Sequence, residues 1–130
     1  MIEYPLQDQI PAGPLPFSPV VRFGGLLFVS GQASTDESGA IVPDTFEGEF
    51  RRSVENLRRL LRAAGADLDR VVQVRSYVRD PADLPLYNRL YREYFAAPFP
   101  ARTTLTNCLP ETLRFEIECI AAAPAEGGGA

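Results

Sequence analysis

The 130-residue sequence contains no histidine and no lysine, so all 13 of its basic residues are arginine. Without histidine the chain lacks the usual general base, any serine–histidine or cysteine–histidine nucleophile pair, and the commonest metal ligand. Without lysine it cannot form a Schiff base with a carbonyl substrate or anchor pyridoxal phosphate. Any catalysis must therefore use arginine, carboxylates, hydroxyls, thiols, backbone groups and water.

Cofactor motifs and long apolar runs are also missing. Gly24-Gly25 matches neither the lysine-bearing phosphate loop nor the GxGxxG pattern, and Cys108 and Cys119 have no metal-ligand spacing. No apolar run is long enough to span a bilayer, and a net charge of −4 gives no reason to bind polyanions. We therefore expect a cytoplasmic protein without a cofactor, a metal, a membrane partner or a nucleic-acid partner.

The length and the ordinary composition, 45% hydrophobic and 23% charged, fit one globular domain, which we expect over residues 1–123. Five prolines in the first 19 residues predict an irregular N-terminal arm. The glycine-rich end predicts a disordered tail over residues 124–130.

Hydrophobic periodicity predicts the order strand, strand, helix, strand, helix, strand, strand. Gly24-Gly25 joins the first two strands as a hairpin. Asp44 or Thr45 caps the first helix, which Gly65 ends, and the five arginines of this helix lie mostly off its apolar stripe, as on a solvated face. The predicted segments are strands 20–23, 26–30 and 71–78, helices 45–65 and 83–95, and two closing strands within 99–122. Two amphipathic helices can cover only one face of such a sheet, so the fold class is α+β.

Alternation along the last strand separates an apolar face from a charged one. The apolar face should lie under the helices and consists of Phe115, Ile117, Cys119 and Ala121. The other face carries Arg114, Glu116, Glu118 and Ile120, to which the middle strand adds Val71, Gln73, Arg75 and Tyr77. A face this mixed is neither a second core nor an open solvent surface and is typical of an oligomer interface. We therefore expect self-association, with pockets at the subunit borders.

Three charged residues near the end of the chain are the first candidates for chemistry. Arg102 lies near the start of one closing strand, and Glu116 and Glu118 lie on the other. A charge on an otherwise apolar strand is costly to bury unless it is paired or holds a ligand. Arg102 could equally serve as an ion-pair partner, and Glu118 could pair with Arg75 or Arg114, so the pattern alone leaves both uses open.

Several short motifs, in this order and spacing, resemble the RidA family of reactive-intermediate (enamine/imine) deaminases, also called YjgF or L-PSP proteins. They are Ser30-Gly31-Gln32, Val54-Glu-Asn-Leu57, Ala63-Ala-Gly-Ala66, Pro100-Ala-Arg-Thr103 and Phe115-Glu-Ile-Glu-Cys-Ile-Ala121. The resemblance implies a chorismate-mutase-like fold and a homotrimer with active sites at the subunit interfaces. It also implies hydrolysis of short-lived enamines and imines, such as 2-aminoacrylate, to 2-keto acids and ammonia, without a cofactor or metal.

The resemblance also implies roles for individual residues. Arg102 matches the arginine that holds the substrate carboxylate, and Glu118 matches the glutamate that orients or activates water. Ser30 matches a serine of the pocket, and Asn88 matches a helix asparagine near the site. An imino acid suits these residues, because arginine binds a carboxylate as a planar fork and hydrolysis needs a placed water with a proton acceptor.

Two positions depart from the family pattern and leave the substrate open. In the arm, Phe17 stands where the family has a tyrosine, and Pro19 stands where it has a glutamine. We expect Phe17 to form a pocket wall, and the two changes favour a larger or aromatic substrate, such as an aminomuconate-like ring-cleavage product. A non-catalytic ligand-binding or chaperone-like trimer is the other alternative. The name endoribonuclease is also used in the family, but the net charge and the missing histidine make RNA cleavage unattractive here.

Overall fold

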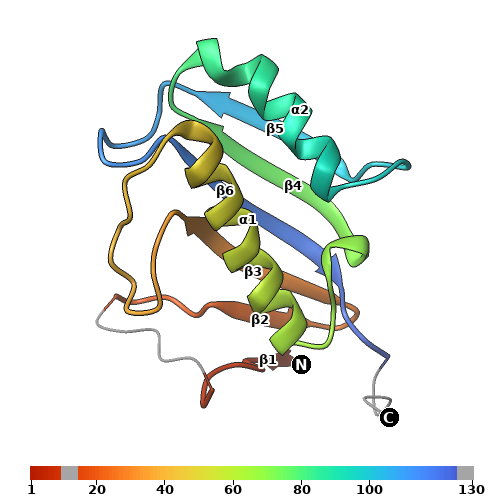
Figure 1. Cartoon of the computed structure of the whole chain (residues 1–130). Helices are drawn as coiled ribbons and strands as arrows, with labels where there is room; N and C mark the ends of the chain where they lie inside the picture. The colour runs from red at the N-terminus through yellow and green to blue at the C-terminus, as the bar shows by residue number, and fades with distance from the viewer. Residues whose placement is uncertain (10–14, 126–130) are drawn as a thin grey trace.

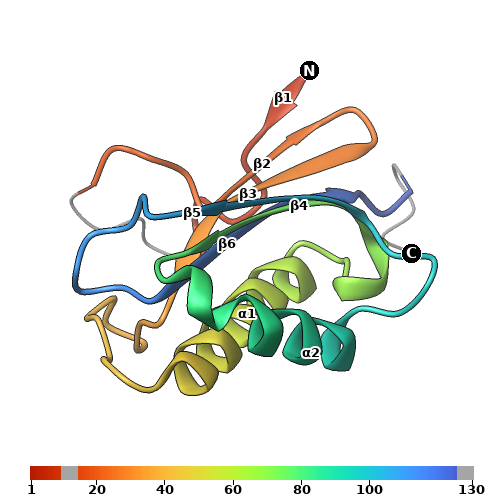
Figure 2. The same cartoon turned by 90° about the horizontal axis from the view of Figure 1, so that it is seen from above.

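The structure is a computed structural model that describes residues 1–9 and 15–125. Six strands form one sheet, and two helices cover one of its faces (Figures 1 and 2). The elements are β1 (Ile2–Glu3), β2 (Val20–Phe23), β3 (Leu26–Ala33), α1 (Phe46–Ala63), β4 (Val71–Val78), α2 (Leu84–Tyr94), β5 (Ala101–Thr106) and β6 (Phe115–Ala122). The predicted α+β class, with both helices on one face, is confirmed.

The order of strands in the sheet is β1-β2-β3-β6-β4-β5. All neighbouring strands are antiparallel except β4 and β5, which α2 connects as a parallel pair. The two closing strands are close in sequence, yet β4 lies between them (Figure 1). Their charged residues are therefore not cross-strand neighbours.

Turn and helix-cap residues explain where the hairpin turns and where α1 begins and ends. Gly24 has a φ of 59°, which a two-residue hairpin turn requires, although β3 runs three residues further than expected. The Thr45 hydroxyl accepts the amide N–H of Gly48, so Thr45 rather than Asp44 is the N-cap of α1. Gly65, with a φ of 87°, follows the last turn of α1, as predicted.

The core lies between the helices and the sheet. All four residues assigned to the apolar face of the last strand are buried there. The assignment of Val71 to the other face was wrong, because Val71 is buried in the core. The register slips between Val71, opposite Ala121, and Gln73, opposite Ile120, so that one extra residue turns Val71 inward.

The N-terminal arm is more structured than the prolines indicated. Residues 1–19 include β1, which pairs with β2, and the buried side chain of Leu6. At the other end, the carbonyl of Pro124 accepts a hydrogen bond from Arg22 at 2.9 Å, so this residue is part of the fold. The rest of the predicted arm and tail, residues 10–14 and 126–130, lies outside the described residues.

The buried carboxylate of Glu49 connects α1 to two loop segments, the one before α1 and the one before β6. Glu49 is 2% exposed and accepts the backbone N–H groups of Arg114 at 2.9 Å and Asp44 at 3.2 Å. The Arg114 guanidinium lies 3.7 Å from the same carboxylate. The prediction that Arg114 points from the far face of the sheet was therefore wrong, since Arg114 precedes β6 and pairs with the start of α1.

Tyr87 is the centre of an aromatic cluster that joins α2 to the sheet. It is fully buried, and its hydroxyl bonds Ser76 of β4 at 2.8 Å and Thr104 of β5 at 3.2 Å. Leu86, the residue before it on α2, is only half-buried. The neighbouring Tyr91 hydroxyl is also buried, but it has no hydrogen-bond partner among residues 1–9 and 15–125.

The two tyrosines provide a matched test of these contacts. Tyr87→Phe removes the partner of two hydroxyls inside the core and should lower the free energy of unfolding by about 1–3 kcal/mol. Tyr91→Phe removes an unpaired hydroxyl and should leave that free energy unchanged or slightly higher. Denaturant unfolding of the three proteins at equal concentration measures both effects. Equal destabilisation by the two variants would contradict this hydrogen-bond assignment.

Candidate functional site

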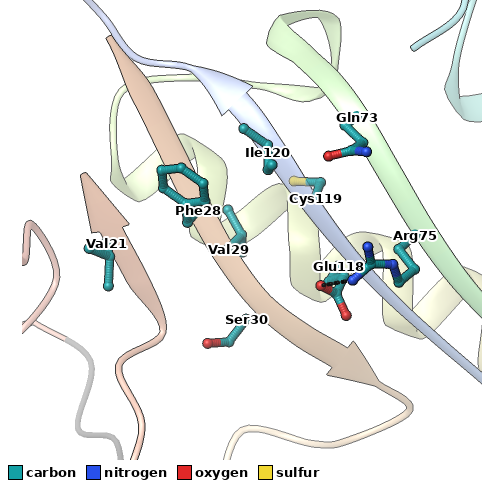
Figure 3. Close-up of a pocket in the computed structure, with 9 residues that line it drawn as sticks. All are labelled: Val21, Phe28, Val29, Ser30, Gln73, Arg75, Glu118, Cys119 and Ile120. Carbon is teal, nitrogen blue, oxygen red and sulfur yellow. Dashed lines mark ion pairs between the residues drawn. The ribbon is translucent and has the colours of Figure 1, made fainter. Parts of the chain in front are cut away.

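A cavity of about 250 Å³ lies on the face of the sheet away from the helices (Figure 3). Strands β2, β3, β6 and β4 each contribute to its wall. Its polar residues include Ser30, Arg75 and Glu118, and the remaining lining consists of Val21, Phe28, Val29, Gln73, Cys119 and Ile120. The cavity therefore combines a carboxylate, a hydroxyl and a guanidinium with apolar walls.

Two neighbours hold the Glu118 carboxylate in place. The Tyr77 hydroxyl donates a hydrogen bond to one oxygen at 2.7 Å. The Arg75 guanidinium lies 3.6 Å from the other oxygen, and Figure 3 shows this ion pair. Because that hydroxyl donates to Glu118 and is partly buried, the pKa of Tyr77 is raised, and the phenol stays a donor. The expected ion pair with Arg75 is confirmed. The alternative pair with Arg114 was wrong, since Arg114 pairs with Glu49.

An irregularity in β3 sets the position of Ser30. The register with β6 shifts between Val29 and Gln32, next to Ser30. The Ser30 hydroxyl donates to the carbonyl of Ser18 at 2.6 Å, and the Ser30 amide donates to the carbonyl of Pro19 at 3.0 Å. These bonds attach the N-terminal arm to the rim of the cavity. Pro19 can take part although proline has no backbone N–H, because it contributes only its carbonyl as an acceptor.

Glu116 lies beside Glu118 on the same face of β6. A Cβ atom at position 31 would lie 2.9 Å from a carboxylate oxygen of Glu116, so glycine there leaves room for this side chain. Burial, followed by the nearby charge of Glu118, raises the pKa of Glu116 above its ordinary value. The folded structure therefore favours the protonated form of the Glu116 carboxyl.

A second cavity, of about 240 Å³, lies where α2 meets the start of β5. Its lining consists of Asn88, Tyr91, Arg92, Phe99, Pro100 and Arg102. Arg102 is opposite Val74 in the β4–β5 register, and Val74 is buried under the helices. Arg102 therefore extends to the helix-covered side of the sheet.

Two tyrosine rings support the Arg102 guanidinium. Its central carbon lies 4.9 Å from the ring centroid of Tyr87 and 4.8 Å from that of Tyr91. The Arg102 side chain makes no ion pair and no hydrogen bond with any residue in 1–9 or 15–125. A guanidinium held over aromatic faces keeps its N–H edge free for a planar anion.

The predicted site residues therefore fall into two groups on opposite faces of the sheet. Ser30 and Glu118 line the first cavity, Asn88 and Arg102 line the second, and Phe17 lines neither. Sequence reasoning missed the groups around them, which are Tyr77 beside Glu118 and Tyr87, Tyr91 and Arg92 around Arg102. The tyrosines of the second helix were the signal for two of these, Tyr87 and Tyr91.

Neither cysteine has the environment of a nucleophile or metal ligand. Burial raises the pKa of Cys119 to about 12, and Cys108 is exposed. Among residues 1–9 and 15–125, no group of three or more cysteine, aspartate or glutamate side chains is placed to hold a metal ion. Within the same residues, neither helix has the length and apolar composition needed to cross a bilayer.

Comparison with known proteins gives consistent matches over nearly the whole chain. The family model described as Endoribonuclease L-PSP matches residues 8–123. Protein mmf2, mitochondrial, from Schizosaccharomyces pombe is 40% identical over 111 residues, which cover 82% of this chain and 87% of that protein. The 2-iminobutanoate/2-iminopropanoate deaminase of Mus musculus is 35% identical over 113 residues, covering 85% and 84%.

Solved structures agree with these matches. The crystal structure of YyfA, a protein of the conserved Rid family from Yersinia pestis, superposes with a TM-score of 0.84 at 28% identity. The alignment covers 95% of this chain and all of that one. The fold described above is thus the fold of that family.

The raised pKa of Glu116 predicts a pH-dependent stability. The folded state favours the protonated carboxyl of Glu116. The stability that this group contributes is therefore fully present below the ordinary pKa of glutamate and is lost as pH rises through the raised pKa of Glu116. Glu116→Gln should therefore unfold less readily than the wild type near neutral pH, and the difference should shrink in acid. Denaturant titrations across this pH range measure it, with the exposed loop variant Glu37→Gln as control. A Glu116→Gln variant that is less stable at neutral pH would contradict the prediction.

Proposed function

The chain belongs to the Endoribonuclease L-PSP family, the RidA proteins, and we propose that it hydrolyses reactive imines and enamines of 2-amino acids to 2-keto acids and ammonia. Relatives about 35% identical over most of the chain are named as reactive-intermediate or iminopropanoate deaminases, which are hydrolases. The observation that carries the proposal is a pair of half-sites, a free guanidinium in one cavity and a positioned carboxylate in the other. The cytoplasmic location stays a prediction.

The complete site requires two copies of the chain. Within one chain, Arg102 and Glu118 lie on opposite faces of the sheet, with β4 between their strands. The outer face exposes apolar side chains, including Phe28, Val72 and Leu105, which favours coverage by another copy. We propose a ring of three, in which the edge strand β5 and α2 of one copy approach the outer sheet face of the next.

In the proposed reaction, Arg102 binds the substrate carboxylate with two parallel hydrogen bonds. Charge-assisted bonds of this kind contribute about 1.5–3 kcal/mol each, which is enough to orient a small substrate. The rings of Tyr87 and Tyr91 limit the guanidinium to one plane and so fix the direction in which the carboxylate must approach. Asn88 lines the same cavity and offers an amide to the imine or its carboxylate.

Glu118 accepts the proton of the attacking water. The water oxygen bonds to the imine carbon while the C=N electron pair moves to nitrogen, and Glu118 passes the proton it accepted to this nitrogen. Glu118 then takes the hydroxyl proton of the aminoalcohol and transfers it to the amino group, which leaves as ammonia as the C=O bond of the keto acid forms. Tyr77 and Arg75 hold the carboxylate in one orientation through both steps. The reaction consumes one water and needs no redox partner, and an enamine enters it after tautomerising to the imine.

Single substitutions test the two roles. Arg102→Ala should abolish imine hydrolysis without unfolding the chain, and Arg102→Lys should restore little, because an ammonium lacks the planar fork. Glu118→Gln should lower kcat about a hundredfold, the usual contribution of a positioned acid–base group. The assay generates the imine in situ with an amino-acid oxidase and follows trapping of the free imine. Arg89→Ala, exposed on α2 outside both cavities, is the matched control; wild-type activity in Arg102→Ala would show that the site is wrong.

Mixing the two inactive variants tests whether two copies share the site. Arg102→Ala and Glu118→Gln chains, refolded together in equal amounts, should regain about a quarter of the wild-type activity, because about one border in four joins an intact arginine to an intact glutamate. Each variant refolded alone is the control. No recovery, or a stable monomer in light scattering at micromolar concentration, would contradict a shared site.

A further inference from the structure

We propose that the cavity at Arg102 recognises a second carboxylate on the substrate through Arg92, so that imines of acidic amino acids are preferred. This inference rests on the proposed function and names its substrate class. It starts from the charge of the cavity lining. Two guanidinium groups face this cavity, and its lining contains no aspartate or glutamate.

The charge of Arg92 is not balanced within the described chain. Arg92 lies on α2 one turn after Asn88, and one of its terminal nitrogens donates to the Asn88 carbonyl at 3.2 Å. It forms no ion pair with residues 1–9 or 15–125. The adjacent acid, Glu93, is engaged elsewhere, because it pairs with Arg51 of α1 at 3.1 Å. The remaining N–H groups of Arg92 are therefore available to a ligand.

The two guanidinium groups favour an anion with two negative charges. Both are exposed at the cavity, whose apolar walls are Phe99, Pro100 and the ring of Tyr91. Two like charges that face one cavity repel each other when it holds no anion, and a dianion relieves this repulsion.

The geometry assigns one carboxylate to each arginine. The 2-carboxylate of the imino acid occupies Arg102, whose orientation is set by the tyrosine rings. The side chain of the substrate then extends along Phe99 toward Arg92, where a terminal carboxylate forms the second pair. Monocarboxylic imines still bind through Arg102 but lack this second interaction. The expectation of a larger or aromatic substrate rested on Phe17 and Pro19, and neither residue lines either cavity.

The test compares two substrates that differ only in the second carboxylate. Oxidase-generated imines of glutamate and norvaline have the same carbon chain, except that a methyl group replaces the distal carboxylate. The wild type should show a kcat/KM at least about tenfold higher for the glutamate imine. Arg92→Gln should remove most of this preference, and Arg92→Lys should retain part of it. Arg89→Gln, exposed on the same helix, should leave the preference unchanged.

Binding of stable keto acids separates this inference from the proposed function. Calorimetry should show tighter binding of 2-oxoglutarate than of 2-oxopentanoate, and Arg92→Gln should reduce the difference. If no imine is hydrolysed but this difference is found, the proposed function fails and the dicarboxylate site stands. If imines are hydrolysed without preference for the second carboxylate, or Arg92→Gln weakens both substrates equally, the inference is overturned while the function stands.

Discussion

The alternation of side chains along each strand controls where the charged groups of this protein can act. Successive residues point to opposite faces of the sheet, so the register between strands decides the face for every side chain. Arg102 is aligned with the buried Val74, and Glu118 is aligned with the exposed Arg75. The two candidate catalytic groups are therefore separated by the sheet itself, and no rotamer change can bring them together within one chain.

The helix-covered half-site depends on the aromatic core. Tyr87 contacts Phe50, Phe115 and Tyr91 through rings whose centroids are 5.8–6.1 Å apart, and its hydroxyl bonds two strands at once. This packing fixes the ring surface on which Arg102 rests. The orientation of the arginine is thus a property of the hydrophobic core, although the guanidinium edge lies at the surface. A site built in this way combines a rigid aromatic support with a guanidinium edge that a ligand can reach.

The outer half-site depends on irregularities of the sheet. The register shift after Val29 places Ser30 on the cavity rim, and Gly31 leaves space for Glu116. Glu116 then lies close enough to Glu118 for their charges to interact. The outer face of the sheet also exposes apolar side chains. The same face therefore carries the candidate catalytic residues and the surface proposed to contact another copy of the chain. Activity therefore depends on self-association in the proposed function, and a loss of self-association would entail a loss of activity.

The sequence by itself determined the order of the elements after the N-terminal arm, the hairpin at Gly24, a helix cap at Asp44 or Thr45 and the buried face of β6, because these depend on local periodicity and turn chemistry. Its motifs also indicated the family and the candidate residues. Only the tertiary structure decided that β4 separates β5 from β6, that Glu49 is buried, and that Tyr87 and Tyr91 lie under Arg102. These features depend on contacts between residues far apart in the chain. Local patterns specify which face of an element is apolar, but they do not specify which element covers that face.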